Sequence, residues 1–217
     1  MKKIAKYSAA ILCVSALSSF AFAAKPGFYL GAGLGGGKVG APDKHILGDF
    51  DSNLVKTSQN EKGLAGRVFT GFNLNEYLGF EAGIAKYATS RFEVKVPALS
   101  SKTDFDQSVK AVDVVAKAYL PIQNSGFNLY ALGGVAYVNS KMEYKTKIDH
   151  QTVDRVNQTE NELRPKYGIG ASYDIPESNL TASLEYSRIQ GKGDLNKSAS
   201  AIPNADLLTF NLSYSFD

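Results

Sequence analysis

The sequence ends on a segment in which large apolar residues alternate with small polar ones. "LLTFNLSYSFD", at 207–217, puts apolar side chains at Leu208, Phe210, Leu212, Tyr214 and Phe216. Successive side chains of a β-strand point to opposite faces, so such a strand has one apolar face and one polar face. A chain that repeats this pattern must place an apolar face against other protein or against lipid on every strand.

Seven earlier segments show the same period of two, and the sequence therefore predicts eight strands. They are 28–37, 63–74, 77–87, 108–120, 127–144, 163–175, 179–190 and 206–216. The connections between them alternate in length. Segments 38–62, 88–107, 145–162 and 191–205 are long and polar, whereas 75–76, 121–126 and 176–178 are short turns. This alternation is typical of an up-and-down barrel with one trimmed end and one elaborated end.

In each predicted strand, every second position carries an apolar residue, and we call these positions the apolar parity and the positions between them the polar parity. The apolar parity indicates that lipid covers these strands. Charges on it occur only toward the long connections, at Lys62, Lys86, Lys110 and Arg188. That leaves a charge-free band, as contact with hydrocarbon requires. After residue 23 no apolar run approaches the roughly 18–20 residues of a membrane helix. The predicted fold is an all-β, eight-stranded antiparallel up-and-down transmembrane β-barrel over residues 24–217.

Aromatic residues on the apolar parity gather near the short turns. Aromatic side chains are enriched where a transmembrane strand leaves the hydrocarbon. We therefore expect an interfacial girdle, with Tyr137 and Tyr186 closer to the opposite edge. The predicted girdle residues are Phe28, Phe72, Phe80, Phe127, Tyr173, Tyr214 and Phe216.

The N-terminal segment predicts export. Residues 1–23 combine Lys2, Lys3 and Lys6 with an apolar run and end on Ala-Phe-Ala, which is typical of a secretory signal peptide cut before Ala24. Cys13, the single cysteine, lies inside this segment, so we expect no disulfide or thiolate metal site in the mature protein. The three lysines account for the whole formal net charge of +3. The mature chain is thus formally neutral, which argues against a nucleic-acid partner.

Several strands and turns, in order, resemble the eight-stranded transmembrane domain of the outer membrane protein A family. They are "GFYLGAGLGGG" at 27–37, "RVFTGFNLNEYLGFEAG" at 67–83, "VDVVAKAYLPI" at 112–122, "RPKYGIGASYDI" at 164–175, "SLEYS" at 183–187 and "LLTFNLSYSF" at 207–216. The resemblance implies a Gram-negative outer membrane, both termini in the periplasm and the long loops outside. It also implies that Phe216 contributes to a C-terminal signal for the barrel-insertion machinery. The family's periplasmic peptidoglycan-binding domain has no counterpart after Asp217, so we expect a barrel-only member.

The polar parity carries charges that an eight-stranded barrel has little room to separate. Such a barrel is just wide enough for side chains, and an unpaired buried charge costs several kcal/mol or more. We therefore expect Lys117 to pair with Glu81 or Asp113, and Arg67 to pair with Glu81 or Glu185.

The resemblance supports part of this set. Glu81, Lys117 and Glu185 fall on inward positions where the family has a charge lattice. Where the family places an arginine and a further glutamate, the chain has Ser183 and Ser172.

Three functions follow from these features. The first is a structural and surface-interaction barrel, plugged by paired charges, that presents four long loops for adhesion or binding. The alternatives are a narrow channel for ions or small solutes and an outer-membrane lipid-modifying enzyme. His45 and His150 both fall in predicted loops with no evident serine partner, so we predict no enzyme, catalytic residue, cofactor or metal. Expected partners are outer-membrane lipid and lipopolysaccharide, the insertion machinery and a host or cell-surface ligand.

Overall fold

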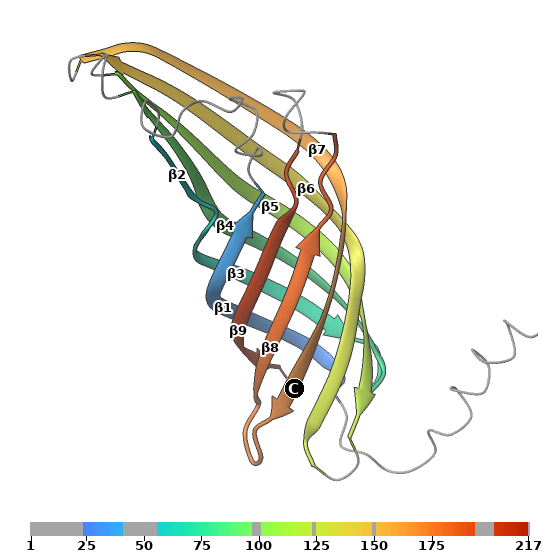
Figure 1. Cartoon of the computed structure of the whole chain (residues 1–217). Coiled ribbons are helices and arrows are strands. Elements are labelled where there is room, and N and C mark those ends of the chain that lie inside the picture. The colour runs from blue at the N-terminus through green and yellow to red at the C-terminus, as the bar shows by residue number, and fades with distance from the viewer. Residues whose placement is uncertain are drawn as a thin grey trace, which may run out of the picture.

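The computed structural model describes residues 24–40, 56–96, 101–122, 125–148, 151–193 and 202–216, so the predicted signal segment lies outside the described residues. It contains nine strands, and Figure 1 shows them curving into a closed barrel whose wall continues past one end. The strands are β1 (Gly27–Val39), β2 (Lys56–Asn60), β3 (Lys62–Asn73), β4 (Leu78–Val96), β5 (Ser101–Pro121), β6 (Phe127–Ile148), β7 (Gln151–Asp174), β8 (Leu180–Ile189) and β9 (Ala205–Ser215).

Closure of the sheet comes from two contacts. β1 pairs with β9, and β4 pairs with β5, which joins the two ends of the order β4-β3-β1-β9-β8-β7-β6-β5. Every pairing is antiparallel, and β2 adds to the outer part of β4 only. The eight strands other than β2 therefore form the predicted antiparallel barrel. Among the described residues, no helix is long and apolar enough to cross a membrane.

The predicted outward parity is confirmed. Phe72, Ile84, Val114 and Ile169 are 37%, 65%, 55% and 65% exposed, although all four are large and apolar. A slip of one residue would have turned each of them into the lumen. The outer wall is thus a continuous apolar surface, and the polar residues that alternate with it along each strand point into the lumen.

The aromatic residues at the short-turn end lie in rows across neighbouring strands. Phe28 is the ladder partner of Phe72, which is in turn the partner of Phe80. The Phe28 and Phe72 rings are 4.7 Å apart, and Phe127 and Tyr173 form a similar pair at 4.6 Å. The Tyr214 and Phe216 rings are also in contact, at 5.2 Å. This arrangement fits the predicted girdle, whose place at a membrane interface stays a prediction.

Two of the four predicted long loops are wrong. Most of 88–107 and 145–162 is strand, because β4 and β5 continue as one hairpin and β6 and β7 as another. With β2 they form a sheet that projects beyond the barrel (Figure 1). We call this sheet the extension; it consists of β2 and of residues 89–96, 101–108, 141–148 and 151–159. These segments are polar, but ladder pairing requires only that each backbone group meets a partner, and partners such as Arg91 and Asp106 also form an ion pair at 2.8 Å.

A bulge separates the barrel from the extension on β4. Lys86 pairs with Lys110 and Thr89 pairs with Ser108, so Tyr87 and Ala88 together lie opposite Val109 and β4 carries one extra residue. Both are only 1% exposed. Inward positions are odd-numbered on β4 below the bulge and even-numbered above it, where Ser90 is buried.

We expect Leu212→Arg to prevent stable assembly. Leu212 lies on the outer face midway along the apolar residues of β9 and is 46% exposed. An arginine near the bilayer midplane costs about 2–4 kcal/mol. Folding into lipid vesicles, followed by heat-modifiable gel mobility, measures the loss. Leu212→Phe is the matched control and should fold normally; equal folding of both variants would contradict lipid contact at this position.

Candidate functional site

Among the described residues, six charged side chains are buried in the lumen. The five that the sequence singled out, from β3, β4, β5 and β8, are joined there by Lys166 of β7, and all are at most 5% exposed. The six are Arg67, Glu81, Asp113, Lys117, Lys166 and Glu185, which we call the charge network. It contains equal numbers of cations and carboxylates, so it is formally neutral.

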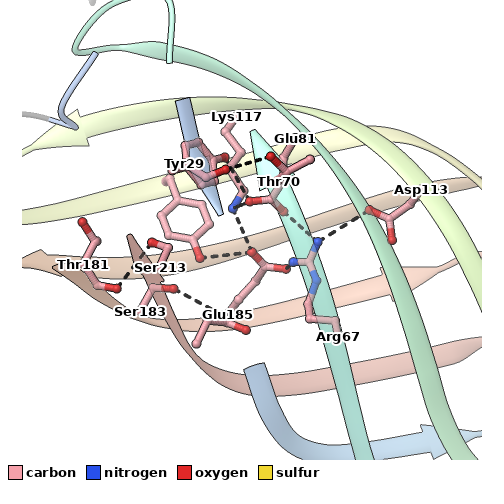
Figure 2. A network of polar contacts seen from close by, with 12 residues as sticks. Tyr29, Arg67, Thr70, Glu81, Asp113, Lys117, Thr181, Ser183, Glu185 and Ser213 are labelled. Carbon is pink, nitrogen blue, oxygen red and sulfur yellow. Dashed lines mark hydrogen bonds and ion pairs between the residues drawn. The ribbon is translucent and has the colours of Figure 1, made fainter. Parts of the chain in front are cut away.

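Arg67 lies at the centre of the charge network. Its Nη2 atom is 2.7 Å from Oε1 of Glu81 and 3.6 Å from Oδ1 of Asp113, and its Nη1 donates to Glu185 (Figure 2). The guanidinium carbon also lies 4.8 Å from the centre of the Phe69 ring. One planar cation thus bridges carboxylates from three different strands, a task suited to its fixed fork of donors.

Lys117 closes a second set of contacts beside the first. Its Nζ atom is 2.6 Å from Oε2 of Glu81 and 3.3 Å from Oε2 of Glu185. The hydroxyl of Tyr29 donates to Glu81 at 3.0 Å, and that of Tyr130 donates to Glu185 at 3.1 Å. Each glutamate therefore has two cations and a hydroxyl around it, which is how a buried carboxylate avoids its desolvation penalty.

Lys166 was missed by the sequence analysis. It is 1% exposed, and its Nζ is 2.8 Å from Oδ2 of Asp113. Asp113 therefore forms ion pairs with Lys166 and Arg67, whereas Lys117 forms ion pairs with the two glutamates. The signal was available, because Tyr167 has the same parity as Tyr173, which is predicted to face outward, and the residue before Tyr167 must then point inward.

Two glycines, which have no side chain, leave room for the rings of Tyr29 and Tyr130. A Cβ atom at Gly71 would lie 2.3 Å from Cζ of Tyr29, and one at Gly170 would lie 2.3 Å from Cζ of Tyr130. The hydroxyl end of each ring thus lies over a glycine on a neighbouring strand. The glycines of the inner wall serve this close packing, which sends the hydroxyls to Glu81 and Glu185.

An apolar layer fills the lumen between the charge network and the extension. Its members come from the barrel strands and from Ile202, and each is at most 4% exposed. We call this set the apolar layer: Val39, Ala65, Ala85, Tyr87, Val109, Ala111, Ala136, Val138, Ile189, Ile202, Ala205 and Leu207. The sequence predicts paired charges in the lumen but no such layer, so this layer is a finding of the structure.

A small polar cavity lies on the opposite side of the charge network. It has a volume of about 40 Å³ and is lined largely by hydroxyl-bearing side chains near the short turns, which is room for roughly three water molecules. Lys25 also lines the cavity: its Nζ donates to the Ser178 carbonyl at 2.6 Å, and Asn73 Nδ2 donates to the Lys25 carbonyl at 2.9 Å.

The described residues contain no cluster of three or more His, Cys, Asp and Glu side chains placed to hold a metal ion. His45 and His150, on which the enzyme alternative depended, lie outside the described residues. The expectation that neither histidine has a serine partner stays a prediction.

Residues 9–216 match the family of the outer membrane protein beta-barrel domain. The chain belongs to this family. It is therefore an integral outer-membrane β-barrel. A protein of uncharacterised function from Coxiella burnetii is 29% identical over 88% of this chain and 85% of its own length. Outer membrane protein A of Klebsiella aerogenes is 26% identical over 95% of this chain.

The chain spans 55% of the length of that outer membrane protein A, so the activity of the whole relative does not transfer to it directly. Among solved structures, Neisserial surface protein A is similar at 16% identity and a TM-score of 0.48, over 87% of this chain and 97% of that one.

Removing Lys117 should destabilise the barrel by about 3–5 kcal/mol, because it leaves Glu81 and Glu185 short of a cation. Lys117→Ala combined with Glu81→Ala should cost less than the sum of the two single changes, since the contact disappears as a unit. Urea unfolding of the chain in lipid vesicles gives the four free energies of the cycle. Arg91→Ala, which breaks an exposed ion pair in the extension, is the control and should cost under about 1 kcal/mol. Additive losses in the cycle would mean that the two side chains do not act together.

Proposed function

We propose that this chain is a closed outer-membrane barrel that holds the extension outside the cell as a binding surface. In this proposal the lumen carries no solute, both termini face the periplasm, and host or cell-surface molecules bind the extension. The extension, rather than four irregular loops, is the part of the barrel that a partner would meet first.

The observation that carries the proposal is the filling of the lumen by two successive layers. A narrow pore that conducts ions through rearranging charge pairs needs a wet path on both sides of those pairs. Here the charge network has a small polar cavity on one side, but the buried side chains of the apolar layer on the other. An apolar constriction of this kind resists hydration. The arrangement favours a structural role over a channel.

The extension offers the surface for a partner. Its hairpins extend to Val96 and Ser101 at one tip and to Ile148 and Gln151 at the other, well past the last buried residues of the lumen. The ladder between β7 and β8 ends at Lys166, and the Pro165 carbonyl accepts one further backbone hydrogen bond from Gln190. Above Pro165, this edge of β7 has no ladder partner among the described residues. Free strand edges accept further strands. An extended segment of a partner protein is therefore one form of ligand that this surface would accommodate.

The lumen should stay closed even when the ion pair between Lys117 and Glu81 is removed. We expect the wild-type chain and the Lys117→Ala/Glu81→Ala variant to show only background conductance in planar bilayers, because the apolar layer remains. Adding Val138→Asn and Leu207→Asn to that variant should open a measurable ion path, since both residues are fully buried in the layer. Heat-modifiable mobility verifies that each variant is folded. Conductance from the first variant alone would overturn the barrier assigned to the apolar layer and favour the channel.

Trimming the extension should abolish surface binding without unfolding the barrel. Ser90 and Gln107 are ladder partners, as are Ser140 and Glu160. An Asn-Gly turn can therefore replace 91–106 and another can replace 141–159 with the strand pairing below them unchanged. Bacteria of a Gram-negative expression host that display the full chain should adhere to cultured epithelial cells, and those with the trimmed chain should not.

Equal surface amounts of the two proteins, measured by gel mobility, are required for this comparison. Adherence by the full chain no greater than that of the empty host would contradict a role in binding these cells, and equal adherence of both chains would exclude the extension as the binding surface.

A further inference from the structure

Two lysines face each other on the outer wall where the apolar band ends. Lys86 of β4 and Lys110 of β5 are ladder partners, and both side chains are exposed. The outward pair immediately below them is Ile84 and Val112, which are 65% and 52% exposed. The two ammonium groups therefore lie at the junction between the lipid-facing wall and the extension.

This pair lacks a counter-ion of the kind that Lys38 has. Like charges directly opposite each other on a ladder destabilise a sheet. In the part of the chain that the structure describes, neither Lys86 nor Lys110 has an ion-pair partner. Lys38, by contrast, lies 3.2 Å from Glu61 at the same edge of the band.

The surroundings of the pair leave space for an anion and supply no carboxylate. On the β3 side the ladder partner of Lys86 is Gly66, which has no side chain, and on the β6 side the partner of Lys110 is Asn139. The next outward pair above consists of Thr89 and Ser108. A ligand on the wall at this point would meet two cations, neutral polar groups and an apolar surface below them.

Basic residues also end the apolar band on most other strands. On six of the barrel strands, the first charged outward residue toward the extension is a lysine or an arginine. These residues are Lys38 on β1, Lys62 on β3, Lys86 on β4, Lys110 on β5, Lys141 on β6 and Arg188 on β8. Such a collar complements the phosphates of a lipid leaflet, which lie just outside the hydrocarbon.

We propose that Lys86 and Lys110 together bind a phosphate group of a phosphorylated lipid in the surrounding leaflet. The phosphate lies between the two ammonium groups and relieves their repulsion, while the acyl chains of the same lipid lie along Ile84 and Val112. Charge-assisted hydrogen bonds from two donors hold the head group more strongly than either lysine alone. The identity of the leaflet rests on the orientation in the proposed function, in which this end faces outward and the lipid is a phosphorylated glycolipid.

Native mass spectrometry of the full chain in detergent, titrated with bis-phosphorylated lipid A, tests the site. Lys86→Gln/Lys110→Gln should weaken lipid A binding by about thirtyfold, from the typical contribution of a lysine at a membrane surface. The matched control is Lys38→Gln/Lys62→Gln, because these lysines are also ladder partners but Lys38 already has Glu61. The control should change binding by less than about threefold. Dephosphorylated lipid A and inorganic phosphate serve as two further probes.

The proposal holds if only the Lys86/Lys110 variant loses lipid A, if dephosphorylated lipid A binds the wild-type chain as weakly as lipid A binds that variant, and if inorganic phosphate does not compete at millimolar concentration. An equal loss of lipid A binding in the two double variants would contradict a specific site and would mean that lipid A responds only to the overall positive charge of this edge. Full binding of dephosphorylated lipid A would remove phosphate from the recognition, and competition by inorganic phosphate would identify a free anion as the ligand. Orientation and cell binding do not enter this measurement, so failure here and failure of the proposed function are separable.

Discussion

Pairing of every backbone N–H and C=O group is the constraint on which this molecule depends. Hydrocarbon offers no hydrogen bonds in exchange, so a sheet inside it must have no edge. The contacts of β1 with β9 and of β4 with β5 remove those edges. A closed ring of only eight strands encloses a lumen little wider than its side chains. Whatever points inward must then pack tightly, and charges on facing strands meet whether or not they are neighbours in the sequence.

The interior solves this packing problem with chemically separate layers. Arg67, Lys117 and Lys166 balance the three carboxylates, and two tyrosines over glycine complete the hydrogen bonding of the glutamates. The apolar layer shields one side of this set from water. A low local dielectric strengthens each ion pair and also raises the cost of losing one partner. In the proposed function the charges therefore stabilise the barrel as a set and do not pass ions.

The strand parity and most of the charge network could be predicted from the sequence, because the period of two follows directly from backbone geometry. Arg67 and Glu81 were assigned inward from their apolar neighbours alone. Lys166 obeys the same rule but is preceded by Pro165 and Arg164 at the end of a predicted strand, so its side chain was not assigned a face. The extension could not be seen, since outside lipid both faces of a hairpin are wet and the apolar alternation disappears. Nor could the apolar layer be predicted, because most of its side chains lie on the polar parity and form a cluster only when eight strands bring them together.

The bulge at Tyr87 and Ala88 has a consequence for how such a chain can change over generations. A single inserted or deleted residue in a continuous ladder would reverse the two faces of everything beyond it. Because the bulge interrupts the ladder between the barrel and the extension, the alternation of inward and outward residues in the distal hairpin is set separately from that in the barrel. Residues can then be gained or lost in the extension while Ile84 stays on the outer face and Glu81 still meets Arg67. The membrane part is free to stay constant as the exposed part diversifies.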